Sequence, residues 1–437
     1  MLTTQENELI TRTGPGTPMG NLMRQYWLPC MLSSEVQADG DPLRVMLLSE
    51  RLIAFRDSNG QVGLVAESCP HRGASLFFGR NEECGLRCVY HGWKFAADGT
   101  CVDMPNEPAE SNFKHKVRAV SYPCVERGGV VWAYMGPRST PPPLPDFEPN
   151  MLPNSAQTVW VTQQECNWLQ VLEGDIDTIH VNFLHGGASN DGRQRSADFV
   201  ATDTDGGACY GAFKPATDPG MTYWRIAHYL FPFYSMAPPG RLGIRVAGIC
   251  RVPMDDTHTL SFSMSPDAGQ GDFGRTSAQS ARATNSFGAN GTGNPVLPNT
   301  TDWFGRFRTT ANGSNDFLID REAQRRREGG VGYTGITGIG VQDAAMTWSM
   351  GPIYDRRHEH LGTTDTMVIK VRRRLIAAAR ALAESGATPP GVDNPEVYRV
   401  RSGWVNLPNE ANWLEATLDL RKAFVDHPEL AGVAQHP

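Results

Sequence analysis

The sequence lacks any uninterrupted apolar run long enough to cross a membrane, for which about 20 consecutive apolar residues are needed. Residues 1–12 also lack the basic stretch followed by an apolar stretch that marks a secretory signal. The 437 residues carry a formal net charge of −7 and no basic tract, whereas a nucleic-acid-binding protein needs a basic face. We therefore expect a cytoplasmic protein that has neither a membrane nor a nucleic acid as its partner.

A disulfide framework and a dinucleotide-binding motif are also missing. The nine cysteines are an odd number and lie scattered along the chain, which favours a reducing compartment. The glycine-rich segment GPGTPMG at 14–20 neither follows a predicted strand nor has the spacing of a dinucleotide fingerprint. We therefore expect that the chain does not collect hydride from a nicotinamide cofactor by itself.

Residues 68–95 hold two short pairs of potential metal ligands, Cys69 with His71 and Cys88 with His91. A tetrahedral zinc ion accepts any mixture of these ligands. A Rieske [2Fe-2S] cluster instead binds both thiolates to one iron and both imidazoles to the other. The order Cys then His in each pair favours the cluster, because each loop can then supply one ligand to each iron. We predict the cluster, with zinc as the alternative.

The length favours two domains, because 437 residues exceed the usual size of one hydrophobic core. Short apolar runs separated by tight turns predict strands near the N-terminal end; these runs are 44–48, 52–55, 62–66 and 128–135. A proline-rich stretch then favours an extended connector. We predict an α+β protein with a helical lead-in, an all-β domain, a connector and a larger second domain. Their bounds are 1–24, 25–136, 137–149 and 150–437.

The second domain is predicted to combine an antiparallel sheet with helices. Strand-like runs occupy 157–164 and much of 210–253. Apolar residues recur at helical spacing over 367–383 and 413–425.

A long segment, 265–315, is rich in Gly, Asn, Ser and Thr. A loop of this length inside a compact domain is typical of a lid or a binding loop. We expect it to form a mobile cover over the pocket, held by Trp303 and Phe304 as isolated apolar anchors. Plain surface disorder is the alternative.

A second group of polar residues lies on the apolar helix predicted for 168–184. Glu173, Asp177 and His180 are spaced four and three residues apart and share one helix face. His185 lies about 140° further round an ideal helix than His180. Both imidazoles reach one ion only if the helix contains a π-bulge or unwinds. Two histidines and one carboxylate form the facial triad of non-haem Fe(II) oxygenases.

Four stretches together extend over nearly the whole chain: TRTGPGTPMG near the start, CPHRGASLFFGRNEECGLRCVYHGWK, NWLQVLEGDIDTIHVNFLH, and MGPIYDRRHEHLGTTD near the end. In these stretches the chain resembles the oxygenase component of Rieske non-haem iron aromatic ring-hydroxylating oxygenases, in particular the phthalate 4,5-dioxygenase-like branch. The resemblance implies a Rieske β-sandwich followed by a helix-grip, START-like catalytic domain. In that fold an antiparallel sheet wraps around a long helix and the iron lies between them.

The resemblance also implies the third iron ligand. In the family an Asp on a later helix completes the triad with His180 and His185, and Asp343 in GIGVQDAAMTW occupies the matching place. Its small apolar neighbours suit a buried carboxylate, which needs a metal or another partner. Asp355 and Asp365 are the alternatives, and they lie among charged or polar residues.

The activity implied by the resemblance is the oxidation of an aromatic acid by O2. Electrons from NAD(P)H would come from a separate reductase and pass through the cluster to the mononuclear iron. The family forms head-to-tail rings, which implies a homotrimer or a multiple of one. There Asp177 would join His91 of one subunit to His180 of the next. We expect hydroxylation of a phthalate-like carboxylate.

The substrate anchor and the reaction type stay open at this point. An anion in an apolar pocket needs a basic partner, and the candidates on the predicted sheet are Arg225, Arg241, Arg245 and Arg251. O-demethylation of a methoxylated aromatic acid would use the same iron. Alternatives of another class are a non-catalytic Rieske electron carrier and a START-like lipid-binding module with a zinc-stabilised appendage.

Overall fold

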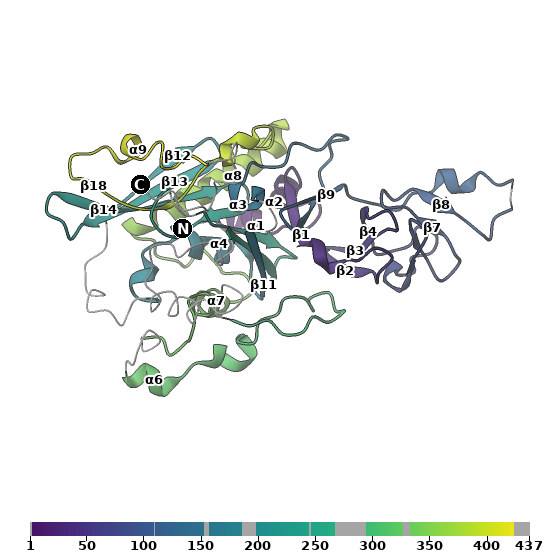
Figure 1. Ribbon diagram of the computed structural model, residues 1–437, viewed down its shortest axis with the longest axis horizontal. Coiled ribbons are helices and arrows are strands. Elements are labelled where there is room, and N and C mark those ends of the chain that lie inside the picture. Colours follow the sequence, from purple (N-terminus) through teal and green to yellow (C-terminus); the bar gives the residue numbers. More distant parts are fainter. Residues whose placement is uncertain are drawn as a thin grey trace.

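The computed structural model of the protein describes most of the chain. The described residues are 2–108, 110–152, 157–185, 198–243, 246–266, 294–326 and 333–423. The molecule is elongated, with a small β-rich lobe at one end and a larger sheet covered by helices at the other (Figure 1). The predicted α+β class is confirmed.

Three small antiparallel sheets contain the strands of the N-terminal part. The first has the order β1 (Trp27–Leu32), β10 (Val130–Tyr134) and β9 (Cys124–Arg127). The second consists of β2 (Leu43–Leu47), β3 (Glu50–Arg56) and β4 (Val62–Ala66). The third consists of β5 (Arg80–Asn81), β6 (Leu86–Arg87), β7 (Lys94–Phe95) and β8 (Cys101–Asp103). The four predicted strand runs are confirmed.

The C-terminal part contains one large antiparallel sheet. Its order is β11 (Gln157–Gln164), β17 (Thr259–Pro266), β16 (Gly248–Pro253), β15 (Tyr234–Met236), β14 (Met221–Leu230), β13 (Gly207–Pro215) and β12 (Asp198–Thr204). β18 (Gly403–Pro408) also pairs with β14. The side chains of β14 alternate between two cores: Ala227 and Tyr229 belong to the main core, whereas Trp224 and Ile226 pack with β18.

Helices cover this sheet and join the two ends of the chain. The α-helices are α1 (Thr4–Thr11), α2 (Pro18–Met23), α3 (Glu148–Met151), α4 (Trp168–Ile176), α6 (Arg321–Arg326), α7 (Ile339–Ser349), α8 (Thr366–Ser385) and α9 (Trp413–Ala416). Short 3-10 turns span Ser33–Glu35, Leu76–Phe78, Phe113–Lys116, His180–Asn182, Gly313–Leu318, Thr363–Asp365 and Pro395–Tyr398. The main core contains buried residues of α4, α8, the large sheet and the β1–β10 pair.

A buried ion network attaches α4 to α8 and to the N-terminal helix. Glu173 of α4 accepts hydrogen bonds from Arg372 of α8 at 2.6 Å and from Arg356 at 2.9 Å. Arg372 also pairs with Glu359, and Arg356 donates to Asn7 of α1 at 3.3 Å. Glu173 is therefore part of the scaffold, although the sequence placed it on the same face as Asp177 and His180.

Two predicted helices are shorter in the structure. The helix predicted for 168–184 ends at Ile176, and the chain turns at Asp177 before His180. Of the helix predicted for 413–425, only Trp413–Ala416 is helical within the described residues. In contrast, the helix predicted for 367–383 is confirmed as the 20-residue α8.

The segment 294–315 packs between the two ends of the molecule. The ring centroid of Trp303 lies 5.4 Å from the guanidinium carbon of Arg44 and 5.3 Å from that of Arg51. Phe304 stacks on His258 with the ring centroids 4.0 Å apart. Trp303 and Phe304 therefore anchor the segment at this boundary, as expected, and its role as a mobile cover stays a prediction. Residues 267–293 of the predicted lid lie outside the described part.

Candidate metal centres

The two loops that carry the predicted cluster ligands have the same backbone geometry. In each loop the cysteine amide donates to the carbonyl five residues later at 2.8 Å, and a glycine amide four residues later donates back to the cysteine carbonyl at 2.9 Å. These glycines, Gly73 and Gly92, have φ angles of 76° and 81°, which residues other than glycine rarely adopt. The loops therefore present Cys69 and Cys88 in equivalent positions.

The side chains of the two loops converge. The rings of His71 and His91 lie edge to face with centroids 4.4 Å apart. Cys69 and Cys88 are buried, and burial raises the pKa of the Cys69 thiol to about 11. The Nδ1 atom of His71 is buried and has no hydrogen-bond partner among the described residues, and such a group normally needs one. Two thiols and two imidazoles in this arrangement fit a Rieske cluster.

Aromatic side chains frame this group. Trp93 stacks on His71 with the ring centroids 4.4 Å apart, which shields that histidine from solvent. Tyr90 packs on His91 at 3.9 Å and is 57% exposed. Desolvation and the neighbouring His71 lower the pKa of His91, which keeps its ring neutral, as a metal ligand must be. His91 is therefore partly buried beside an exposed ring.

The second group of potential ligands forms where α4 ends. The backbone of Asp177 leaves the helical conformation, with φ −90° and ψ 104°. Its carboxylate accepts a hydrogen bond of 2.8 Å from the amide of Ile179, which supports the turn that begins the short 3-10 segment at His180. Because the helix unwinds before His180, His180 and His185 can face each other. The predicted unwinding is confirmed, although it begins earlier than the glycines suggested.

His180, His185 and Asp343 lie together. The Nε2 atoms of the two histidines are 3.2 Å apart, and Asp343 Oδ1 lies 3.5 Å from His180 Nε2 and 3.0 Å from His185 Nε2. Metal–ligand bonds of about 2.1 Å at right angles place neighbouring ligand atoms about 3 Å apart. The donor set therefore fits an ion bound on one face. The predicted burial of Asp343 is wrong, because 38% of its side-chain surface is exposed.

Each histidine has a different partner on its outer nitrogen. Asp177 Oδ2 lies 3.5 Å from His180 Nδ1, and Gln342 Oε1 lies 2.7 Å from His185 Nδ1. Desolvation by itself would lower the pKa of His180, but the carboxylates of Asp177 and Asp343 raise it overall. Burial would raise the pKa of Asp177, but its interaction with His180 lowers it overall. Both rings therefore turn Nε2 towards Asp343.

Models of two protein families match this chain. The Rieske [2Fe-2S] domain matches residues 26–123, and the LigXa C-terminal domain-like family matches residues 133–426. The 3-chlorobenzoate-3,4-dioxygenase oxygenase subunit of Comamonas testosteroni is 44% identical, over 94% of this chain and 97% of the relative.

The chain belongs to the Rieske non-haem iron oxygenases.

Other relatives support this assignment. The phthalate 4,5-dioxygenase oxygenase subunit of Pseudomonas putida is 38% identical over 87% of each chain. The phenoxybenzoate dioxygenase subunit alpha of Ectopseudomonas oleovorans is 31% identical over 90% of each chain. The crystal structure of dicamba monooxygenase bound to dicamba has the same fold, with a TM-score of 0.55 at 17% identity over 82% of this chain and 98% of that one.

The protein is therefore the oxygenase subunit of a Rieske aromatic oxygenase, and its cofactors are a [2Fe-2S] cluster and a mononuclear non-haem iron. The zinc site and the non-catalytic carrier considered from the sequence are wrong. Among the helices within the described ranges, none is both long and apolar enough to span a membrane.

Asp355 and Asp365, the alternatives for the third iron ligand, form hydrogen bonds or ion pairs with nearby residues. Asp355 pairs with Arg357 at 2.6 Å, and this guanidinium holds the pKa of Asp355 far below its usual range. Asp365 accepts a hydrogen bond of 2.6 Å from the amide of Gly362 at the start of a turn. Both carboxylates therefore have local partners.

The four candidate arginines differ in their partners. Arg251 is buried and donates to both oxygens of Asp175, at 2.7 and 2.5 Å, so its charge is already paired. Arg241 is exposed. Arg225 donates from Nε to the hydroxyl of Thr178 at 3.0 Å, and its terminal nitrogens have no partner among the described residues. Arg245 lies outside the described part.

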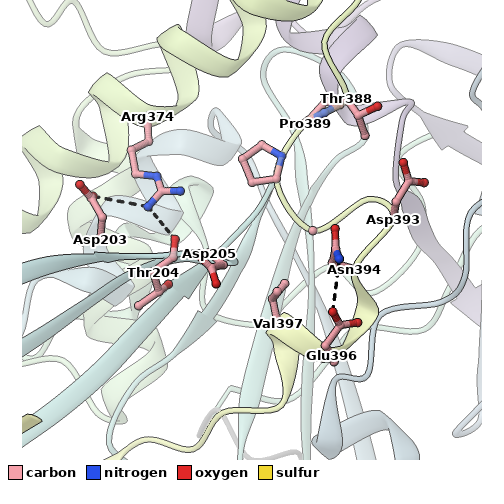
Figure 2. Close-up of a pocket in the computed structure, with 12 residues that line it drawn as sticks. Asp203, Thr204, Asp205, Arg374, Thr388, Pro389, Asp393, Asn394, Glu396 and Val397 are labelled. Carbon is pink, nitrogen blue, oxygen red and sulfur yellow. Dashed lines mark hydrogen bonds and ion pairs between the residues drawn. The ribbon is translucent and has the colours of Figure 1, made fainter. Parts of the chain in front are cut away.

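A large open cleft of the oxygenase lies away from both groups of ligands. It has a volume of about 740 Å³ and is bounded by α8, the turn after β12 and the segment 388–397 (Figure 2). Two of its acidic residues are paired: Asp203 contacts Arg374 at 3.4 Å and Lys370 at 3.2 Å, and Asp393 pairs with Arg138. The residues that line the cleft include none of the two groups of ligands described above.

The residue that sequence reasoning missed is Gln342. Its only sequence signal is that it directly precedes Asp343 on the same helix. The need for it follows from chemistry, because a ligating imidazole usually donates its other N–H to an acceptor. Which residue supplies that acceptor depends on how α7 lies beside His185.

Proposed function

We propose that this oxygenase hydroxylates an aromatic carboxylate, using O2 and electrons that come from NAD(P)H through a separate reductase. The observation that carries the proposal is the convergence of His180, His185 and Asp343 on one point. The names of three relatives add support, because they describe oxygenases of chlorobenzoate, phthalate and phenoxybenzoate. All three named compounds are aromatic acids.

The proposed residue roles follow the donor sets. Cys69, His71, Cys88 and His91 hold the [2Fe-2S] cluster, and His180, His185 and Asp343 hold the mononuclear iron. When bound, the cluster supplies single electrons and the iron supplies the chemistry of O2 activation. The contribution of the chain is to turn both imidazole Nε2 atoms towards one point and to hold the carboxylate 3.0 Å from His185. Three protein ligands leave coordination positions open for O2 and substrate.

The chain divides, in this proposal, at the boundaries expected from its sequence. The segment 1–24 is a lead-in, 25–136 is the Rieske domain, 137–149 is the connector, and 150–437 is the catalytic domain. The Rieske family match ends at residue 123 and the LigXa-like family match begins at residue 133. These limits support a boundary near the connector.

Electron transfer is proposed to occur between subunits of a homotrimer or a multiple of one. The strands β7 and β8 that flank a cluster loop belong to the small lobe, whereas α4 and α7, beside or on which the proposed iron ligands lie, belong to the larger part of the same chain (Figure 1). Asp177 contacts His180 and still has 32% of its side-chain surface exposed, so its carboxylate can also accept a hydrogen bond from His91 of a neighbouring subunit. Asp177 would then connect the two metal sites.

The substrate carboxylate is proposed to bind Arg225 or Arg245. Arg225 supports the proposal because Thr178, its partner, lies between Asp177 and His180. Its terminal nitrogens, which have no partner among the described residues, can form a two-pronged contact with a carboxylate. This geometry would place the aromatic ring of the substrate beside the iron ligands.

A second candidate reaction is O-demethylation of a methoxylated aromatic acid. The 5,5'-dehydrodivanillate O-demethylase oxygenase subunit of a Sphingobium species is 37% identical over 52% of this chain and 55% of that protein. The same iron ligands would serve both reactions, and the substrate pose would decide between them.

A screen of aromatic acids tests the proposal. The purified oxygenase, with a surrogate reductase, NADH and 18O2, is incubated with chlorobenzoates, phthalate isomers, phenoxybenzoates and methoxybenzoates. Consumption of an acid with 18O in a ring hydroxyl group supports hydroxylation, whereas release of formaldehyde supports O-demethylation. Oxidation of neutral aromatics or alcohols alone would overturn the assigned substrate class.

Paired arginine variants test the anchor. Arg225→Gln is expected to raise KM for the acid about 10- to 100-fold, because a hydrogen bond to a charged group contributes about 1.5–3 kcal/mol. Arg241→Gln, at an exposed position, is the control and should leave KM unchanged. An unchanged KM in Arg225→Gln would assign the anchor to Arg245.

A further inference from the structure

Gln342 is a buried amide that directly contacts an iron ligand. It is 3% exposed, and its Oε1 lies 2.7 Å from Nδ1 of His185. It also directly precedes Asp343 on α7. One helix therefore presents a potential ligand and a contact to another ligand from two successive residues.

The orientation of this amide is fixed by its other hydrogen bonds. Nε2 donates to the carbonyl of Ile336 at 2.8 Å and to the hydroxyl of Thr334 at 3.1 Å. Only the nitrogen can donate to a carbonyl, so Oε1 is the atom that faces His185. An amide oxygen accepts and cannot donate. The hydrogen in this contact must therefore come from His185 Nδ1.

The tautomer of His185 follows from this contact. A neutral imidazole carries one N–H, and with that hydrogen on Nδ1 the Nε2 atom has a free lone pair. Nε2 is the atom that faces Asp343 Oδ1 at 3.0 Å. If the hydrogen were on Nε2 instead, it would occupy the position in which a metal ion binds.

We propose that Gln342 is a positioning residue that holds His185 in the iron-binding tautomer and orientation and thereby sets the affinity for the mononuclear iron. The inference rests on the proposed ligation by His180, His185 and Asp343. Loss of such a partner typically weakens metal binding about 10- to 100-fold. The two histidines are held differently, because His180 has the carboxylate of Asp177 and His185 has a neutral amide.

A purely structural role for Gln342 predicts a different result. In that case the amide serves only to attach the segment 334–336 to α7 through its Nε2 donations. Gln342→Glu separates the two roles, because a carboxylate still accepts from His185 Nδ1 but cannot donate to Ile336 or Thr334. Gln342→Met removes both functions at similar side-chain volume.

A second buried glutamine provides a matched control. Gln170 of α4 is 1% exposed and also forms three hydrogen bonds, donating to the carbonyls of Thr347 and Gly351 and accepting from the amide of Tyr354. None of these partners is a potential metal ligand. Gln170→Met therefore removes the same number of buried hydrogen bonds beside α7 without touching His185.

The experiment measures iron retention rather than turnover. Each purified variant is dialysed against a series of iron chelators of increasing strength. The mononuclear iron is then counted per Rieske cluster, with the visible absorption of the cluster as internal reference for folded protein. Gln342→Met is expected to bind iron 10- to 100-fold more weakly, with Gln342→Glu within threefold of the unmodified protein. Gln170→Met should keep its iron.

Each outcome decides for or against the inference. Equal iron loss in Gln342→Met and Gln342→Glu, or full retention in both, would overturn it. Where Gln342→Met does not fold, Gln342→Asn replaces it: the shorter side chain keeps an amide but withdraws its oxygen from His185 Nδ1, and full iron retention in that variant would overturn the inference. Asp343→Ala tests the underlying ligation separately, because a variant that keeps its iron would refute the proposed triad itself.

Discussion

The two metal-binding regions of this oxygenase are built in different ways. Each cluster loop is a local structure, in which one cysteine, one histidine and one glycine with positive φ lie within five residues. The proposed iron ligands come from the turn after α4 and from α7, and Asp343 lies 158 positions after His185 in the chain. Local loops depend on turn geometry, whereas the iron site depends on how α4 and α7 pack.

The difference shows in what surrounds each ligand. The potential cluster ligands contact residues of the two loops themselves, such as Trp93 of the second loop on His71 of the first, and Tyr90 on His91 within the second. Around the proposed iron ligands, contacts cross between elements, as in the hydrogen bond that Gln342 Oε1 accepts from His185 Nδ1. Metal sites of the second kind are more sensitive to changes in the scaffold.

The largest expected effect comes from removing one ligand of the cluster loops. Cys88→Ser should abolish the Rieske absorption and all turnover, because a serine hydroxyl does not replace the thiolate that iron requires. The mononuclear iron should remain bound, since His180, His185 and Asp343 belong to other elements. Iron and acid-labile sulfide analysis checks this, and loss of both metals would show that the two regions are not independent.

Asp177→Asn should affect the connection between the regions rather than either one. We expect both metals and the oligomer to remain, and oxidation of the reduced cluster in a single turnover to slow about 10- to 100-fold, in the range seen for partners of metal ligands. Stopped-flow absorption of the cluster measures this rate. An unchanged rate, or a fully active monomer, would eliminate the proposed bridge.

Glu173→Gln should destabilise the scaffold of the iron site. Removing this carboxylate leaves Arg356 and Arg372 buried with less compensation, which typically costs about 3–5 kcal/mol. Urea unfolding followed by tryptophan fluorescence measures the change. Asp419→Asn, which breaks an exposed pair with Lys422, is the control and should leave the midpoint unchanged.

A smaller effect is the loss of folding stability at low pH that we expect from His228 of β14. Burial lowers the pKa of His228 to about 3, whereas the unfolded chain has a pKa of about 6.5. The unfolded state therefore takes up a proton first as the pH falls, and the stability present above pH 6.5 is lost progressively between about pH 6.5 and 3. Between pH 7.5 and 5 this contribution should fall by about 2 kcal/mol.

The variant His228→Gln checks this value. Urea unfolding at pH 7.5 and at pH 5 should show a smaller loss of stability in the variant than in the unmodified protein. Equal losses in both proteins would mean that His228 is protonated in the folded state.

The smallest effect compares the two cluster loops with each other. Gly73→Ala should cost about 1 kcal/mol, because its φ is positive and alanine is strained there. Gly92→Ala should cost more, since its added Cβ would also lie 2.6 Å from Cγ of Pro105, whereas nothing lies within 4 Å of the Cβ at Gly73. The temperature at which the cluster absorption is lost measures both, and equal values would argue against this difference.

Much of the fold could be predicted because it depends on short-range patterns. The strand runs 44–48, 52–55, 62–66 and 128–135 and the helix 367–383 are such patterns, and the structure confirms them. The paired Cys and His motifs predicted the cluster for the same reason, since each loop is complete within a few residues. Asp343 is far from the histidines in sequence, and only the family resemblance identified it.

The amino-acid sequence by itself determined the two ligand pairs, the strand runs of the small sheets and the period of α8. Only the tertiary structure decided where α4 ends, that Trp303 and Phe304 pack at a domain boundary, and that Gln342 meets His185. The physical reason is the range of the interactions. Turns and caps depend on neighbouring residues. A helix end, a packed aromatic ring and the hydrogen bond between α7 and His185 depend on groups that folding brings together from distant parts of the chain.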